Sequence, residues 1–262
     1  MRFRPRALNE TSENSRGGKE SLLNRSKGIL SAVVVLAAIY LGLGVLADFT
    51  VNLVPPQTEA QWFSWTEDLL QPTLPVPDDL QIIFDRLIAD AELDDFPFRL
   101  VYLPAEEVNA FALPGGLIAV TQGLYENVHS AEGRALVLGH EIGHVQYRHG
   151  LQRIGRSILL AGALSLSGID TTTVLQRSQY LADLQFSRHQ ESESDDFGMR
   201  LVYRTYGTTA GSMEFFENLE NLHLEDRGFQ DRFGSFLRTH PQTSDRLEDL
   251  RELAKGLESS SS

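Results

Sequence analysis

His140-Glu141-Ile142-Gly143-His144 is the stretch of this sequence that decides most about its fold. The apolar run Ala135-Leu136-Val137-Leu138 precedes it and favours a helix from Ser130, a good N-cap residue, to about His149. Four residues make roughly one helical turn, so the two imidazoles lie on one face of that helix. Both rings can therefore reach one metal ion through Nε2, at about 2.0–2.1 Å.

Glu141 is predicted to be the general base of this site. Its position in the motif is a poor one for binding the same ion, but it places the carboxylate beside a water that the ion activates. There it can accept the proton of that water and later pass it to a leaving amine. A five-residue match also occurs by chance in ordinary helices. Because the match lies in a predicted apolar helix, we expect a metal site.

A catalytic zinc ion needs a third protein ligand, and the best candidate lies 47 residues after the second histidine. Glu191, Asp195 and Gly198 are spaced i, i+4, i+7 and share one stripe of a long helix predicted over 171–203. Glu191 can bind zinc, and Asp195 can accept a hydrogen bond from the Nδ1–H of a zinc histidine. Gly198 would permit close helix packing. Glu193 is predicted to lie on a solvated helix face.

His240 is the remaining histidine with a candidate role, because it stands in a predicted loop directly before Pro241. It can complete the zinc shell at rest or stabilise an oxyanion. A surface loop histidine is the simpler alternative on these residues alone. The other histidines are predicted to lie at the surface or to support the ligands from behind: His129, His149, His189 and His223.

Composition limits the class of protein. The chain has 262 residues, enough for one catalytic domain with an appendage, and no cysteine, so any metal is held by His, Asp or Glu. Residues 1–27 hold seven Lys/Arg against three Glu, a net charge of about +4. The whole chain carries −13, so the remainder carries about −17. Such an acidic domain repels nucleic acid, and we expect no nucleic-acid partner.

Residues 28–47 contain no charged side chain and, as a helix, span about 30 Å, one hydrocarbon core. The basic cluster precedes them, so the positive-inside rule places the N-terminus in the cytoplasm and the acidic domain in the periplasm. A cleaved signal peptide is the alternative. The long basic tail and the long apolar run favour an uncleaved, single-pass anchor in the cell (inner) membrane.

The chain beyond this segment is predicted to be mostly helical, an α+β domain with a small antiparallel sheet. We expect a Pro-rich linker over 48–77 with one short helix near 62–70, the catalytic domain over 78–256, and a disordered tail over 257–262. Residues 158–169 are too short to span a bilayer, and we favour a buried helix over one that dips into the membrane face. The other expected elements are a helix from Asp78, a strand over 98–103, a hairpin over 109–121, a helix over 212–222, a Phe-containing loop before His240, and a last helix ending at Lys255-Gly256.

Four ordered blocks resemble a known family, the membrane-associated zinc peptidases that include the CAAX prenyl endopeptidases, the HtpX-type heat-shock peptidases and the periplasmic outer-membrane-assembly proteases. The region of resemblance runs from about Leu80 to Leu253. The blocks are Asn109-Ala110-Phe111-Ala112-Leu113-Pro114-Gly115-Gly116, the His140–His144 motif, Ser187-Arg188 through Asp195, and Thr239-His240-Pro241.

The resemblance implies a compact gluzincin (zincin-like) fold with one zinc ion per subunit, held by His140, His144 and Glu191. It also implies that an extended protein or peptide substrate adds to a strand edge, formed here by Asn109, Ala110, Phe111 and Ala112. In periplasmic relatives the histidine that matches His240 can cap the metal and keep the enzyme inactive. The block with Ser194 has Ala in the common pattern, a mild departure.

The single clear span makes this chain more similar to the periplasmic quality-control members than to the multi-span prenyl peptidases. The leading hypothesis is therefore a membrane-anchored zinc endopeptidase that cleaves unfolded or misassembled envelope proteins. A second hypothesis is a latent zinc protein that acts as a chaperone or assembly factor, although Glu141 argues against permanent inactivity, because binding alone needs no general base. A metal-independent scaffold would leave the four blocks unexplained.

Overall fold

The computed structural model describes residues 22–93, 96–165, 186–221, 227–241 and 244–260, and it divides into two compact units, residues 1–45 and 46–262. Helix α1 (Leu22–Val51) contains the predicted apolar segment and extends beyond both of its expected ends. Among the described helices, only the stretch Ser26–Val51 is long and apolar enough to cross a membrane. Length and composition of this kind fit both an anchor and a signal sequence.

The second unit contains a three-stranded sheet with the order β1-β3-β2. Strand β2 (Ala110–Leu113) pairs antiparallel with β3 (Leu117–Thr121), which confirms the predicted hairpin. Strand β1 (Arg99–Leu103) pairs parallel with β3, so the predicted antiparallel sheet is wrong in this respect and the sheet is mixed. All five residues of β3 are buried, as expected for a central strand, and β2 forms one edge.

The turn between β2 and β3 requires glycine. Gly115 and Gly116 have φ values of 88° and 84°, the left-handed region in which a Cβ is strained. The backbone N–H of Gly115 donates a hydrogen bond of 2.9 Å to the buried carboxylate of Glu59. Glu59 belongs to α2 (Pro56–Trp62), which together with α3 (Thr66–Leu69) occupies the expected linker. The linker is thus partly helical. Helix α3 lies within 62–70, where one short helix was expected, and α2 is an additional helix that was not expected.

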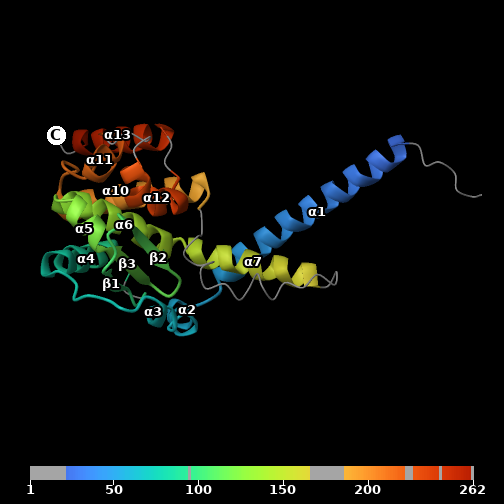
Figure 1. Cartoon of the computed structure of the whole chain (residues 1–262), viewed down its shortest axis with the longest axis horizontal. Coiled ribbons are helices and arrows are strands. Elements are labelled where there is room, and N and C mark those ends of the chain that lie inside the picture. The colour runs from blue at the N-terminus through green and yellow to red at the C-terminus, as the bar shows by residue number, and fades with distance from the viewer. Residues whose placement is uncertain (1–21, 94–95, 166–185, 222–226, 242–243, 261–262) are drawn as a thin grey trace, which may run out of the picture. The chain divides into compact units, whose positions relative to one another are not determined.

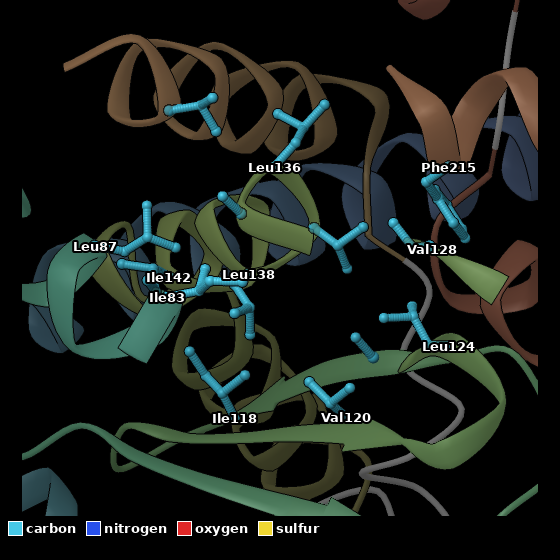
Figure 2. Packing of buried hydrophobic residues seen from close by; sticks show 14 of the residues in the cluster. Ile83, Leu87, Ile118, Val120, Leu124, Val128, Leu136, Leu138, Ile142 and Phe215 are labelled. Carbon is cyan, nitrogen blue, oxygen red and sulfur yellow. The ribbon is translucent and has the colours of Figure 1, made fainter. Parts of the chain in front are cut away.

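Helix α6 (Ala131–Gln146) is the centre of the domain. It begins at Ser130, whose hydroxyl accepts a hydrogen bond from the Gly133 amide, so the predicted N-cap is confirmed. It packs against β2 and β3 as well as against the helices α4 (Asp78–Ala91) and α10 (Arg188–Tyr206). Figure 2 shows the resulting core, in which α6 contributes Leu136, Leu138 and Ile142 between side chains of the sheet and of α4. This all-round burial explains why the motif helix is apolar on almost every face.

Helices α6 and α10 approach each other closely because glycines lie where they cross (Figure 1). A Cβ on Gly198 would lie 2.8 Å from the backbone N of His140, and a Cβ on Gly139 would lie 3.0 Å from Cα of Gly198. The predicted packing role of Gly198 is therefore confirmed. The crossing brings the motif helix and the acidic helix together at the level of the metal-binding residues.

Gly198→Ala should destabilise the protein by about 1–3 kcal/mol, because the added methyl meets backbone rather than a movable side chain. It should also weaken zinc binding, since it forces apart the two helices that carry the candidate ligands. Gly256→Ala is the matched control: it lies inside a helix with nothing within 4 Å, and it should be neutral or stabilising by about 0.5–1 kcal/mol. Chemical denaturation of both variants measures the difference. Equal stability of Gly198→Ala and wild type would contradict the close crossing.

Several element boundaries differ from those predicted. The motif helix ends at Gln146, and a separate helix, α7 (His149–Ser165), begins after two intervening residues. Ile158 on α7 is 52% exposed, which contradicts the predicted burial at that residue, and 166–169 lie outside the described residues. The long helix begins at Arg188, and 171–185 of its predicted span also lie outside the described part. The Phe-containing segment before His240 is not a loop but a helix, α12 (Arg227–Thr239).

Three further helices complete the described residues. Helix α5 (Gln122–Asn127) follows β3 directly, with the Thr121 side chain as its N-cap. Helix α11 (Glu214–Asn221) corresponds to the helix expected over 212–222. Helix α13 (Ser244–Ser259) packs on α10 and continues through Gly256 instead of ending there.

Candidate metal centre

Four side chains from three segments of the chain converge on one point: His140 and His144 of α6, Glu191 of α10, and His240 directly after α12. Each offers one ligand atom, and these four atoms lie within 4.8 Å of one another. All four residues are buried, with at most 5% of their surface exposed. The structure thus brings together candidate ligands that are spread over 100 residues of the sequence, from His140 to His240.

The separations between ligand atoms fit a tetrahedral zinc ion. Nε2 of His140 lies 3.0 Å from Nε2 of His144 and 3.2 Å from Nδ1 of His240. The carboxylate of Glu191 lies 3.7 Å from His140, 3.5 Å from His144 and 3.1 Å from His240. Ligands held tetrahedrally at about 2.0–2.1 Å are roughly 3.3–3.4 Å apart. Three imidazoles and a carboxylate are also a donor set typical of zinc.

His140 is oriented by a carboxylate on its far side. Its Nδ1 lies 2.8 Å from Oδ1 of Asp195, which leaves Nε2 to face the cluster. Asp195 is held in turn by Arg246 of α13 in a bidentate pair, with Nε to Oδ2 at 2.7 Å and Nη2 to Oδ1 at 2.9 Å. Burial alone would raise the pKa of Asp195, but His140 and Arg246 hold it below its ordinary value. Asp195 thus lies behind His140, a candidate metal ligand, on the side of the ring that faces away from the cluster.

Glu191 is ionised in this setting. Burial would raise the pKa of its carboxyl, but the imidazoles of His144 and His240 hold that pKa far below the ordinary range. Arg246 also contacts Glu191, with Nη1 2.6 Å from Oε2. An ionised carboxylate is the form that binds a metal ion.

Glu141 lies beside the four-residue cluster, as the motif predicts. Its side chain is fully buried, and neither carboxylate oxygen has a hydrogen-bond partner among the described residues. Burial raises the pKa of Glu141, while His240 and His140 act to lower it. A carboxyl group with a raised pKa is suited to accept a proton near neutral pH.

His240 lies within the cluster and not at the surface. Its Nε2 is 3.5 Å from Oε1 of Glu141, and its ring stacks on Phe236 with centroids 4.8 Å apart. Phe186 stacks on His144 in the same way, at 3.9 Å, and its backbone N–H donates to the carbonyl of Thr239. These contacts hold a closed arrangement in which both the cluster and Glu141 are buried.

The edge strand β2 runs beside Glu141. Strand β2 packs on α6, and the backbone amide of Ala112 is among the groups that lower the pKa of Glu141. Asn109 directly precedes the strand, with its backbone N–H bonded to the Thr121 hydroxyl. Ala110 is buried, while Phe111 and Ala112 are partly exposed. The edge strand β2, which has one partner strand among the described residues, therefore lies next to the candidate base.

Two further residues support this centre: Arg246, which had no predicted role, and His149, which was expected to lie at the surface or to support the ligands from behind. Arg246 is a charged residue on the stripe that it shares with Leu250 and Leu253, and that position was the available signal. His149 is 1% exposed, with Nδ1 2.9 Å from Nδ1 of His144. Burial lowers the pKa of His149 to about 4, so its ring is neutral near neutral pH. Nothing in the sequence pattern distinguished it from the other histidines.

Comparison with known proteins agrees with this geometry. Residues 77–254, about two thirds of the chain, match the sequence model of peptidase family M48. A putative beta-barrel assembly-enhancing protease of Vibrio cholerae is 29% identical over 185 residues, which cover 65% of this chain and 37% of that protein.

Two other relatives carry similar names. Metalloprotease LoiP of Escherichia coli is 34% identical over 162 residues, which are 58% of this chain and 60% of that protein. Mitochondrial metalloendopeptidase OMA1 of Schizosaccharomyces pombe is 28% identical over 181 residues, covering 65% and 50%. The matched region thus spans between 37% and 60% of the length of these three relatives.

Proposed function

Since the chain belongs to peptidase family M48, we propose that it is a zinc-dependent endopeptidase whose metal is held by His140, His144 and Glu191. The observation that carries this proposal is the convergence of these three ligand atoms, at separations that fit zinc, next to the unpartnered carboxylate of Glu141. Asp195 fixes the tautomer of His140, and Arg246 fixes Asp195. The elements of a metallopeptidase site are then all carried by helices: two ligands and the base by α6, the third ligand and Asp195 by α10, and Arg246 by α13.

The chemistry divides between the ion and the protein. When bound, zinc supplies a Lewis acid that polarises a carbonyl and makes water acidic enough to lose a proton near neutral pH. Glu141 accepts that proton and passes it to the amine nitrogen of the leaving fragment. A substrate strand that pairs with the edge formed by Asn109, Ala110, Phe111 and Ala112 would bring its peptide bond alongside Glu141.

The closed arrangement is interpreted as a latent form of this enzyme. A catalytic zinc site keeps one position open, whereas His240 stands at the position of a fourth ligand. With His240 in place and Glu141 fully buried, a peptide bond has no access to the base. Activity therefore requires that His240 move away from the cluster.

The proposed location and substrates rest on the N-terminal helix and on the relatives. The apolar stretch Ser26–Val51 would anchor the chain in the cell membrane, with the basic tail in the cytoplasm and the peptidase domain in the periplasm. One relative is named for beta-barrel assembly, which supports unfolded or misassembled envelope proteins as substrates. The second candidate, a latent zinc protein that assists assembly without cleaving, is favoured by the burial of the whole site.

Removal of zinc tests the peptidase function. The full chain in detergent should cleave casein, lose that activity on treatment with a chelator, and regain it when one equivalent of zinc is returned, because the ligands are preorganised in the fold. Magnesium should not restore it, since the imidazoles of His140 and His144 are poor ligands for magnesium. Cleavage that persists without zinc would contradict the proposal. Zinc binding without cleavage, also after replacement of His240, would favour the assembly role.

A further inference from the structure

The two candidate zinc histidines on α6 are supported in different ways. His140 has the carboxylate of Asp195 at its Nδ1, at 2.8 Å. At the equivalent atom of His144, the structure places another imidazole: Nδ1 of His149 lies 2.9 Å away. A metal-binding histidine almost always donates its second ring N–H to a fixed acceptor. The acceptor available to His144 is therefore a histidine.

Only one distribution of hydrogens satisfies this pair. If His144 binds zinc through Nε2, its own hydrogen is on Nδ1. Two Nδ1 atoms 2.9 Å apart can share a single hydrogen, so His149 must accept through Nδ1 and carry its own hydrogen on Nε2. Nε2 of His149 faces Oε2 of Glu193 at 3.4 Å. The carboxylate is an acceptor for that N–H, and its 37% exposed side chain has the freedom to close the distance.

The turn before α7 positions His149. Arg148 has φ 56°, a left-handed backbone that is strained in a residue other than glycine. Its side chain donates to the carbonyl of Val54 and lies 3.3 Å from the buried carboxylate of Glu59, contacts that fix the turn. The strained residue reverses the chain so that His149, five residues after His144, returns to the far side of its ring.

Glu193 is the solvent-exposed end of the series of contacting side chains His144, His149 and Glu193. It lines a cavity of about 410 Å³ together with His149, Tyr147 and His189. Nε2 of His189 also lies 3.6 Å from Glu193, but His189 is 83% exposed and does not touch the buried imidazoles. Glu193 was expected to be a solvated helix-face residue. It is only partly exposed and is the outer end of a path that runs from His144 through His149 to the cavity.

We propose that His149 is a positioning residue that fixes the tautomer and the ring orientation of His144, with Glu193 fixing His149 in turn. The inference rests on the proposed zinc site. His149 plays for His144 the part that Asp195 plays for His140, with an imidazole inserted before the carboxylate. Ser194, whose hydroxyl lies 3.5 Å from Nδ1 of His149, is the more distant partner and is not required.

Zinc affinity of the full chain in detergent, measured by competition with a chelating dye, tests the proposal. His149→Phe keeps an aromatic ring but removes the acceptor, and it should weaken zinc binding about 10- to 100-fold. His149→Gln retains an acceptor oxygen and should stay within about threefold of wild type. Glu193→Ala should cost about two- to tenfold, because water in the cavity can replace the carboxylate. His189→Phe and Ser194→Ala are controls, expected within about twofold.

Two further measurements distinguish a positioning role of His149 from a role in stability alone. The unfolding temperature of the zinc-free protein should be alike in His149→Phe and His149→Gln, and the visible spectrum of the cobalt-loaded protein should change only in His149→Phe. Wild-type zinc affinity in folded His149→Phe would overturn the proposal, and so would equal losses in the Phe and Gln variants. If His149→Phe does not fold, unchanged affinity in Glu193→Ala overturns it. A wild-type chain that binds no zinc would instead refute the zinc site itself.

Discussion

Glu141→Gln is expected to lower kcat for casein cleavage by roughly 10²–10⁴-fold, the usual contribution of a positioned general base. The amide has nearly the shape of the carboxylate but cannot accept a proton from water at neutral pH. The side chain of Glu141 is fully buried, and no other side chain among the described residues donates a hydrogen bond to it. The substitution should therefore leave the fold and the zinc content unchanged while removing the chemistry.

Glu132→Gln provides the matched control, since Glu132 lies in the first turn of the same helix and far from the motif. It should retain wild-type kcat. Comparable activity of Glu141→Gln and wild type would mean that another group takes the proton, and the assignment of the base would fail. A loss of zinc in Glu141→Gln would mean that Glu141 belongs to the ligand set.

His240→Ala is expected to raise kcat/KM by about tenfold or more. If His240 holds the site shut, the open form is a minor state, typically populated at about 0.1–10%. Removing the fourth ligand makes the open form dominant, and the apparent activity rises by the inverse of that population. The variant should keep its zinc, because His140, His144 and Glu191 remain.

The same variant distinguishes the two roles considered for His240. Its Nε2 lies 3.5 Å from Glu141, close enough to stabilise an oxyanion in an open site. Lost activity with zinc retained would assign that catalytic role and contradict the latent form. His189→Ala, an exposed histidine on α10, should leave activity unchanged and so controls for the loss of an imidazole.

The parts of the site that follow from local helix geometry could be predicted. His140 and His144 are one turn apart on one helix, and Glu191 and Asp195 are one turn apart on another, so their mutual placement depends on the helix alone. The glycine at position 198 also indicated which face of the second helix meets the first. These features needed only the identification of two helices.

The parts that depend on non-local packing could not be predicted. The parallel pairing of β1 with β3 arises because the chain passes from β1 to β2 on the far side of β3 and only then returns to β3, a path that period-2 patterns do not encode. The position of His149 depends on a left-handed residue at Arg148, a conformation for which an arginine gives no warning. Arg246 was given no role from the sequence, because its contact with Asp195 depends on how α13 packs on α10. His240 was left open because its burial depends on α12, which was expected to be a loop.

Native mass spectrometry of the full chain, released from detergent, tests the central claim most directly, because it counts metal ions per polypeptide. We expect one zinc ion in wild type and in Glu141→Gln, and none in the double variant His140→Ala/His144→Ala, in which only Glu191 and His240 of the cluster remain. A wild-type chain without zinc, or a double variant that retains it, would contradict the claim that these residues form the metal centre of a peptidase.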